Sequence, residues 1–219
     1  YWENKEEMPM IIAKFIDVAG AMLQKYLSSL FTFVDATKFS DWHMNEVNIH
    51  VCNKIANRTV YPIGISFITK SVAEPVNEAV PEGNGLAYLD AGYDDNKTIG
   101  VMFKKGYTPI VCPNKNRWRG YWRKKARKLY RMREHRLGYR QRGRGESLFG
   151  SLTNQFGDRL NVRNLIAMQT RISARIFCYQ IKLLIRAREV KIMLIVRHAP
   201  INYAKNHRKY GIFMPPIFD

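Results

Sequence analysis

Three acidic residues stand at nearly equal intervals along the chain, in settings where a carboxylate could take part in chemistry. Asp35 lies within the apolar stretch FTFVDATKF, Asp90 ends the segment GLAYLD, and Glu146 begins the apolar run ESLFGSL. A carboxylate among Phe and Val side chains is costly to bury unless it is paired or bound to a cation. Because all-oxygen ligand sets suit Mg²⁺ or Mn²⁺, the three acids are candidate ligands of a divalent metal site.

The chemistry that such a site supports is phosphodiester displacement. Two divalent ions about 3.5–4 Å apart can activate an attacking hydroxyl and stabilise the leaving oxygen. Each acid alone also fits a structural role, because Asp commonly forms turns and Glu at a helix start complements the helix dipole. The functional interpretation therefore depends on whether one fold brings all three acids together.

The charge of the chain is large and unevenly distributed. The 219 residues carry a formal net charge of +18, and their 46% hydrophobic content is typical of a globular protein. Residues 1–95 hold 7 Lys and Arg against 13 Asp and Glu, a net of −6, whereas residues 96–219 hold 29 against 5, a net of +24. So basic a chain needs a polyanionic partner, either nucleic acid or, less favoured by its pattern, an anionic membrane surface.

The positive charge is densest in one segment, residues 114–145. Within residues 115–144 there are 14 basic side chains and one acid, Glu134. Basic side chains can follow a DNA backbone, and aromatic rings can stack on bases. The alternative is a solvated basic helix whose aromatic side chains pack on the domain. The candidate DNA-binding residues of this segment are Lys115, Arg117, Trp118, Arg119, Trp122, Arg123, Lys124, Lys125, Arg127 and Arg144.

Other kinds of site are disfavoured. His43 and His50 are interpreted as structural, because lone histidines near strands rarely bind metal. The cysteines lack the spacing of a zinc site, and we expect reduced thiols in a cytoplasmic protein; they are Cys52, Cys112 and Cys178. The apolar stretch 8–23 contains two charges and is too short to span a bilayer.

The order of the expected elements indicates how the acids are positioned. Helical spacing of apolar residues predicts helices over 9–30, 71–80, 94–106 and 161–188, and one that begins at 146. Runs of β-branched and aromatic residues predict strands over 31–39, 47–55, 59–69, 85–90 and 107–113. Three antiparallel strands followed by alternating helices and parallel strands indicate an α/β, ribonuclease H-like mixed sheet with flanking helices. This fold requires acids on the first strand, at the end of the fourth, and at the start of a helix after the fifth.

The residues around the acids resemble one known family. Tyr139, Arg142 and Glu146 are spaced as in the Tyr-Arg-Glu-Lys signature of DDE transposases from prokaryotic insertion sequences. The segment DAGYDD, which contains Asp90, resembles the second acidic motif of these enzymes, and VDATKF, which contains Asp35, resembles the first. The similarity covers residues 30–190.

The resemblance implies a metal-dependent DNA transposase. Asp35, Asp90 and Glu146 would be catalytic metal ligands for a pair of Mg²⁺ or Mn²⁺ ions, and Tyr139 and Arg142 would contact phosphates near the scissile bond. Water would hydrolyse a phosphodiester at the transposon end, and the freed 3′-hydroxyl would attack target DNA. The implied partners are the terminal inverted repeats and target DNA, bound by a homodimer, with no membrane. The implied location is the nucleoid of a prokaryotic cytoplasm.

The sequence departs from the family pattern at one position. The signature Lys belongs seven residues after Glu146, where this chain has Thr153. The contact with the transposon end that is attributed to that Lys must be weaker, absent, or supplied by a neighbour such as Arg159.

The expected organisation has three parts. We expect residues 1–30 to form a helix that ends an upstream DNA-binding region, residues 31–190 to form the catalytic domain with the basic segment, and residues 191–219 to form a C-terminal tail. The alternative function is a non-catalytic basic nucleic-acid-binding protein or an inactive transposase remnant. Asp35 and Asp90 argue against it, because a pure binder gains nothing from acids at these points.

Overall fold

A computed structural model describes residues 6–29, 31–41, 45–56, 59–67, 72–116, 119–157, 159–162 and 164–198, without the side chains of 145 and 191–198. The α-helices are α1 (Met8–Tyr26), α2 (Ala73–Ala79), α3 (Asn96–Lys104), α4 (Tyr121–Arg131), α5 (Arg133–Tyr139), α6 (Glu146–Phe156) and α7 (Leu165–His198). Two 3₁₀ helices are η1 (Ala91–Tyr93) and η2 (Arg140–Gly145). The strands are β1 (Phe31–Asp41), β2 (Glu46–Ala56), β3 (Thr59–Phe67), β4 (Leu86–Leu89), β5 (Thr108–Val111) and β6 (Arg159–Leu160).

The strands form one mixed sheet in the order β3-β2-β1-β4-β5, and β6 pairs with the end of β1. Strands β1, β2 and β3 are antiparallel neighbours, whereas β4 and β5 are parallel to β1. Strand β3 carries Pro62, which cannot donate to a ladder and is tolerated on an edge strand. The expected ribonuclease H-like α/β sheet, three antiparallel strands and then parallel ones, is confirmed.

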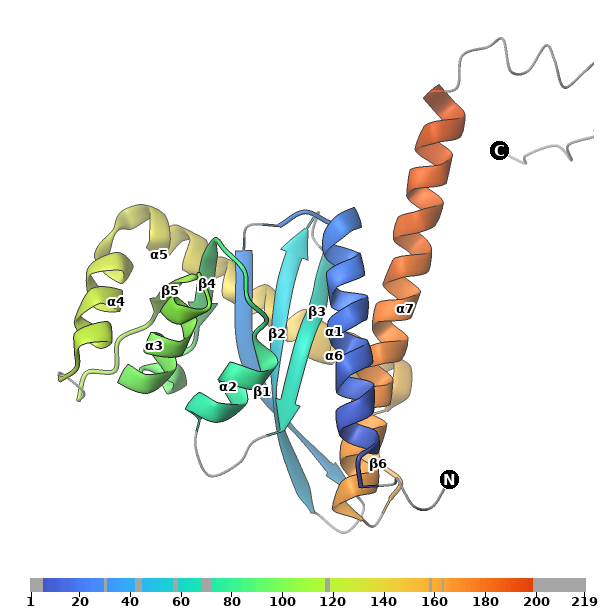
Figure 1. Ribbon diagram of the computed structural model, residues 1–219, viewed down its shortest axis with the longest axis horizontal. Helices are drawn as coiled ribbons and strands as arrows, with labels where there is room; N and C mark the ends of the chain where they lie inside the picture. Colours follow the sequence, from blue (N-terminus) through green and yellow to red (C-terminus); the bar gives the residue numbers. More distant parts are fainter. Residues whose placement is uncertain are drawn as a thin grey trace, which may run out of the picture.

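Helices stand at both ends of the sheet (Figure 1). Helices α1 and α7 run side by side at the β3 end, where Ile16 and Leu23 of α1 are fully buried in the main core. The buried amide of Gln180 on α7 donates to the carbonyls of Ile16 and Pro62, at 2.8 and 2.9 Å, and so ties both helices to the sheet. Helices α4 and α5 lie at the opposite end, beside β5.

All predicted helices and strands are present, with shifted ends. Helix α1 ends at Tyr26 because Leu27 leaves the helical conformation and the Ser29 hydroxyl bonds to the backbone of Phe31. Helix α7 begins only at Leu165, because Leu160 pairs with Asp41 in β6. Within the described part of the chain, no helix is long and apolar enough to cross a membrane.

Candidate active site

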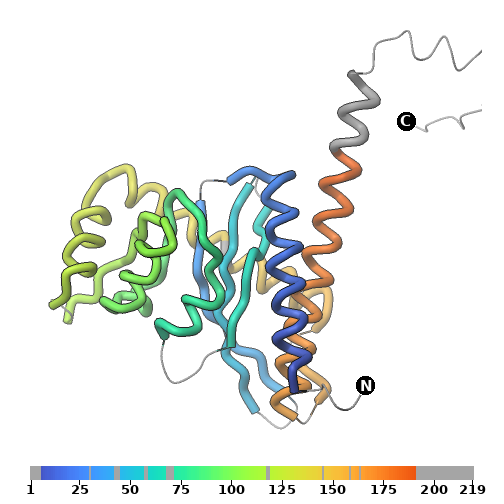
Figure 2. Tube along the Cα trace, viewed as in Figure 1, coloured from blue at the N-terminus to red at the C-terminus, as the bar shows by residue number. Residues whose placement is uncertain are grey.

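Asp35 and Asp90 lie side by side on neighbouring parallel strands. The last paired residues of β1 and β4 are Val34 and Leu89, so each acid stands one position beyond its partnered residue. Figure 2 shows the early and middle parts of the chain meeting here, as β1 and β4 run together. In sheets of this kind, sites collect at the carboxyl ends of parallel strands.

A single guanidinium bridges the two acids. Nη1 of Arg142 lies 3.4 Å from Oδ1 of Asp35, and Nη2 lies 3.7 Å from Oδ1 of Asp90. The exposed fractions of the side chains are 13% for Asp35, 51% for Asp90 and 20% for Arg142. Asp90 also accepts a hydrogen bond from the N–H of Ala91, at 2.7 Å, which fixes its carboxylate at the start of η1. These ion pairs hold η2, which carries Arg142, beside the acids that follow the paired residues of β1 and β4.

The charges around Asp35 oppose one another. Burial raises the pKa of its carboxyl most strongly, and the negative charges of Asp90 and Glu146 raise it further. The Arg142 guanidinium and the N–H of Ala36 lower the pKa, but the net shift is upward. A crowded carboxylate of this kind is relieved by a nearby cation.

The third acid, Glu146, is the exposed first residue of α6. Its charge contributes to the pKa of both Asp35 and Arg142, so it lies within electrostatic range of the bridged pair. Over the described ranges, no three His, Cys, Asp or Glu side chains lie close enough together to hold one metal ion. Asp35 and Asp90 fit a divalent cation by their oxygen donors and their shared strand ends, whereas Glu146 would have to approach them.

Arg142 is supported by an aromatic cluster on the sheet. Its guanidinium lies 5.9 Å from the ring centroid of Tyr139, which contacts the rings of Tyr88 and Tyr130 edge-on. Tyr88 is buried on β4 and stacks on Phe33 of β1. Tyr139 is therefore packed beside the acids, with its pKa raised chiefly by burial.

The Tyr-Arg-Glu residues do not lie on one continuous helix. Tyr139 ends α5, Arg142 lies in η2 and Glu146 begins α6. Residues Gly143 and Gly145 fall within η2, and glycine is unfavourable in an α-helix. The three residues thus lie on three successive elements, and the 3₁₀ turn between the helices directs Arg142 at the two strand-end acids.

His50 and Tyr93 form a buried pair next to this site. His50 on β2 is opposite Ala36 on β1, and Tyr93 ends η1 after Asp90. Burial lowers the pKa of His50 to about 4, so its ring is neutral near pH 7. His50 thus has the structural role that was predicted for it, while His43 lies outside the described residues.

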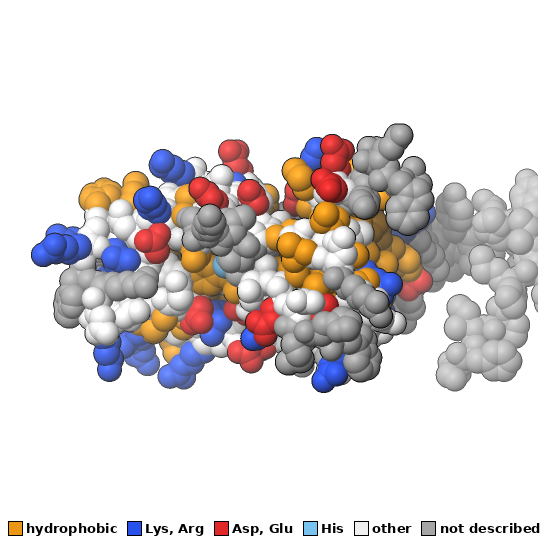
Figure 3. Space-filling model, turned by 90° about the horizontal axis from the view of Figure 1, so that it is seen from below, with side chains coloured by type: hydrophobic (Ala, Val, Ile, Leu, Met, Phe, Trp, Pro, Cys, Tyr) orange, Lys and Arg blue, Asp and Glu red, His pale blue; other side chains and the backbone are white. Residues whose placement is uncertain are grey.

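The basic candidates divide into outward and inward side chains. Figure 3 shows Lys and Arg side chains gathered around the end of the molecule that carries α4. Arg117 and Trp118 lie outside the described residues. Trp122 is half-buried and stacks on Phe103, and Arg123 and Arg127 pair with Asp94. The exposed candidates are Lys115, Arg119, Lys124, Lys125 and Arg144.

Sequence reasoning missed the role of Asp94. The N-cap of α3 is Asp95, whose Oδ2 accepts from the N–H groups of Lys97 and Thr98 at 3.0 Å. Asp94 is instead buried against α4. The i, i+4 spacing of Arg123 and Arg127 beside buried Ala126 is the signal that could have indicated an inward arginine pair.

Thr153 uses its hydroxyl inside its own helix. Its Oγ1 donates toward the carbonyls of Phe149 and Gly150, both at 3.0 Å. Arg159, the neighbour considered as a substitute for the signature Lys, lies in β6 and is exposed.

The model of one protein family matches this chain. The family is described as Transposase DDE domain, and the match covers residues 48–181, more than half of the chain. The matched region begins after Asp35 and includes both Asp90 and Glu146. No curated protein matches the chain.

Proposed function

Because the chain belongs to the Transposase DDE domain family, we propose that it is a DNA transposase that cleaves phosphodiesters at transposon ends and joins the freed 3′-hydroxyl to target DNA. The observation that carries the proposal is the Arg142 bridge between Asp35 and Asp90. Two carboxylates and a guanidinium at the ends of adjacent parallel strands form a site for a phosphate and its counter-cations.

The family generally uses divalent metal ions. When bound, Mg²⁺ or Mn²⁺ would neutralise charge on the scissile phosphate and lower the pKa of the attacking hydroxyl. Asp35 and Asp90 would hold the cations with their carboxylate oxygens. Glu146 would complete the set of metal ligands from the start of α6. Its side chain is exposed, so rotation about its side-chain bonds would bring the carboxylate toward Asp35 and Asp90.

Arg142 has the second role in this proposal. Its fork-shaped guanidinium can bind two phosphate oxygens at once, which orients the scissile group against the acids. The ring of Tyr139 lies beside the arginine, with 5.9 Å between its centroid and Cζ of Arg142. Both side chains act by binding and orientation, which are large contributions to phosphoryl transfer.

The proposed unit is residues 31–190, on which α1 is docked through Ile16 and Leu23. We propose that it acts as a homodimer on terminal inverted repeats and target DNA, in the nucleoid of a prokaryote. The exposed basic side chains at the α4 end of the sheet would hold the DNA backbone.

The test is strand cleavage of a plasmid that carries the DNA flanking the gene, with Mg²⁺ or Mn²⁺ present. We expect nicking at the element ends, lost in Asp90→Asn and Glu146→Gln with DNA binding retained. The control is Glu78→Gln, which removes an exposed acid of α2. Full cleavage by both site variants would overturn the assignment.

A second candidate is a non-catalytic DNA-binding protein, and the observation that favours it is Thr153. Its hydroxyl is bonded within α6, and a threonine cannot reach a phosphate as a lysine can. The same plasmid experiment separates the two functions, because this candidate binds the ends without cleaving them in any divalent metal.

A further inference from the structure

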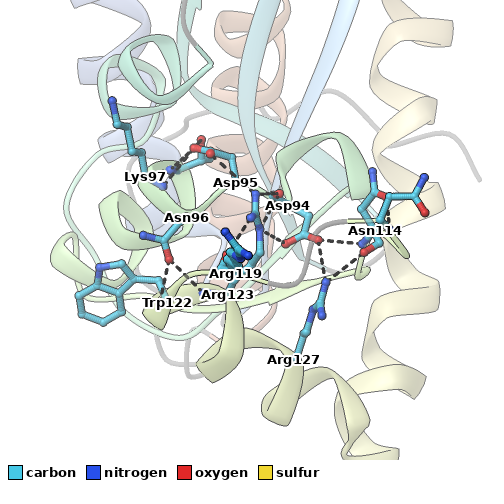
Figure 4. Close-up of polar contacts among 11 residues, drawn as sticks. Asp94, Asp95, Asn96, Lys97, Asn114, Arg119, Trp122, Arg123 and Arg127 are labelled. Atoms are coloured by element: carbon cyan, nitrogen blue, oxygen red, sulfur yellow. Dashed lines mark hydrogen bonds and ion pairs between the residues drawn. The ribbon is translucent and has the colours of Figure 1, made fainter.

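The buried carboxylate of Asp94 attaches the basic helix α4 to the turn that follows Asp90. Nε of Arg123 lies 3.1 Å from Oδ1 of Asp94, and Nη2 of Arg127 lies 3.7 Å from its Oδ2. Arg123 also donates to the backbone carbonyl of Asp94, at 2.7 Å from Nη2. Figure 4 shows both arginines pointing from α4 toward this residue. The exposed fractions are 3% for Asp94, 12% for Arg123 and 17% for Arg127.

The loop before α4 is tied to the same carboxylate. The N–H of Asn114 donates to Oδ2 of Asp94 at 2.8 Å, and Arg127 donates to the carbonyl of Asn114 at 3.0 Å. A buried carboxylate with several charge-assisted hydrogen bonds is a strong and directional anchor.

The start of α4 is capped from another element. No side chain of its own segment caps it, and Oδ1 of Asn96 accepts from the N–H groups of Trp122 and Arg123 at 3.0 and 3.4 Å. Gly120 precedes the helix at a φ of 122°, where a side chain would collide with Asn96. Helix α4 is therefore oriented by side chains from the loop that follows Asp90 and by the first residue of α3.

The inward arginines leave a defined outward surface on α4. Tyr121 is 70% exposed, and the three cations that follow it at spacings of 3, 4 and 3 are exposed as well. These spacings place all four side chains on one helical face. We call this face the outward stripe, and its residues are Tyr121, Lys124, Lys128 and Arg131.

We propose that Asp94 is a positioning residue that sets the angle of the outward stripe relative to the acid pair, so that DNA phosphates on the stripe continue into the site at Asp35 and Asp90. Asp94 is joined to Asp90 by one 3₁₀ turn, in which the N–H of Tyr93 donates to the carbonyl of Asp90 at 3.0 Å. This inference rests on the proposed function, and it assigns Arg123 and Arg127 to anchoring rather than to DNA contact.

The proposal can be tested because it predicts weaker DNA binding for a variant in which simple electrostatics predicts tighter binding. Asp94→Asn makes the basic face more positive, so charge alone would tighten DNA binding. If Asp94 positions α4, the same variant binds DNA more weakly. Asp95→Asn is the matched control, since it removes one acid from the same loop while asparagine still caps α3. The ion pair that this control removes is long, with Oδ1 of the 39% exposed Asp95 lying 3.9 Å from Nη2 of Arg123.

A second variant preserves charge. Arg123→Lys keeps the positive charge but cannot make the forked contacts with Asp94. If Arg123 contacted a DNA phosphate at the surface, lysine would keep that contact. If Arg123 anchors α4 to Asp94, the anchoring contacts are lost in the lysine variant.

Two measurements on the full chain decide the proposal. The first is the rate of tryptic cleavage within residues 121–131, without DNA. The second is the affinity for a short fluorescent duplex of arbitrary sequence. We expect Asp94→Asn and Arg123→Lys to be cleaved about tenfold faster and to bind about tenfold more weakly. Asp95→Asn should be cleaved at the wild-type rate and bind at least as tightly as the wild type.

Each outcome has one meaning. Wild-type cleavage rates in both anchor variants would overturn the anchor, and unchanged or tighter binding by Asp94→Asn would overturn its effect on DNA. If the wild type binds no duplex, the proposed function and the DNA role fail, while the proteolysis rates still decide whether Asp94 holds α4. Binding without plasmid cleavage would count against the transposase assignment alone.

Discussion

The phenol oxygen of Tyr93 lies 2.6 Å from Nδ1 of His50, and the two rings meet edge-on in the core. The pair joins β2 to the turn that follows Asp90. Nε2 of His50 has no hydrogen-bond partner among the described residues, and His50 is only 3% exposed. A protonated imidazole would place an unpaired charge in this position, which explains why burial depresses its pKa.

The first prediction concerns the stability of the fold in acid. The pKa of His50 falls from 6.5 in the unfolded chain to about 4 in the folded one, so the unfolded state binds more protons below pH 6.5. The contribution of neutral His50 to the free energy of unfolding is therefore fully present above pH 6.5. About 3 kcal/mol of this free energy is lost as the pH falls toward 4. We expect urea unfolding to show this loss in the wild type relative to His50→Gln. Parallel pH profiles for the two proteins would contradict the prediction.

The second prediction concerns competition between Arg142 and metal. Arg142→Gln removes the cation that bridges the acids, so Mn²⁺ should bind about fivefold more tightly, a change of about 1 kcal/mol. Cleavage should fall at the same time, because the phosphate loses its forked donor. Titration of Mn²⁺ followed by electron paramagnetic resonance measures the affinity.

The control for this prediction is Arg144→Gln. It removes the same charge from an exposed position two residues away. An Arg142→Gln protein that binds Mn²⁺ more weakly than the Arg144→Gln protein would show that Arg142 does not compete for the acids.

The third prediction concerns the salt dependence of DNA binding. Each phosphate contact contributes about 0.9 to the slope of log affinity against log salt on duplex DNA. Replacing Lys124 and Lys128 of the outward stripe by Gln should therefore reduce the slope by about 1.8. Lys38→Gln is the control, because Lys38 pairs with Glu46 at 2.6 Å on β1 and β2. Equal slopes for the double variant and the control would exclude phosphate contact by the stripe.

The fourth prediction concerns the departure from the family signature. Thr153 lies two helical turns from Glu146 on α6, about 10 Å along the axis. Thr153→Lys should raise the affinity for the element ends about fivefold, because it adds a cation on the side of Glu146. Thr153→Gln adds length without charge. Identical end binding by the Lys and Gln variants would mean that this position does not face DNA.

Much of the site could be predicted because its parts depend on local patterns. β-Branched and aromatic runs indicated the strands that carry Asp35 and Asp90. The apolar stripe after Glu146 indicated α6, and its buried residues are Leu148 and Leu152. These patterns determine which face of each element is buried, and thus the direction of the acids.

The remainder could not be predicted because it depends on contacts between distant residues. The sequence of α4 alone predicts a uniformly basic, solvated helix. The contact that turns Arg123 inward is with Asp94, which lies 29 residues earlier in the chain. The 3₁₀ turn that directs Arg142 arises where glycines interrupt a helix, and it follows Tyr139, whose ring contacts Tyr88 on the distant strand β4. Neither local propensity nor composition contains this information.

The place of Asp35 inside an eleven-residue strand has a consequence for how the gene can change. β1 is paired with β2 on one side and with β4 on the other, and Phe33 and Val34 are buried in separate core clusters. Loss of a single codon between Phe31 and Asp35 would move every following side chain to the opposite face of the sheet. Strand β1 should therefore tolerate substitution at many positions but no change of length, whereas natural insertions in relatives should gather in the connections between strands.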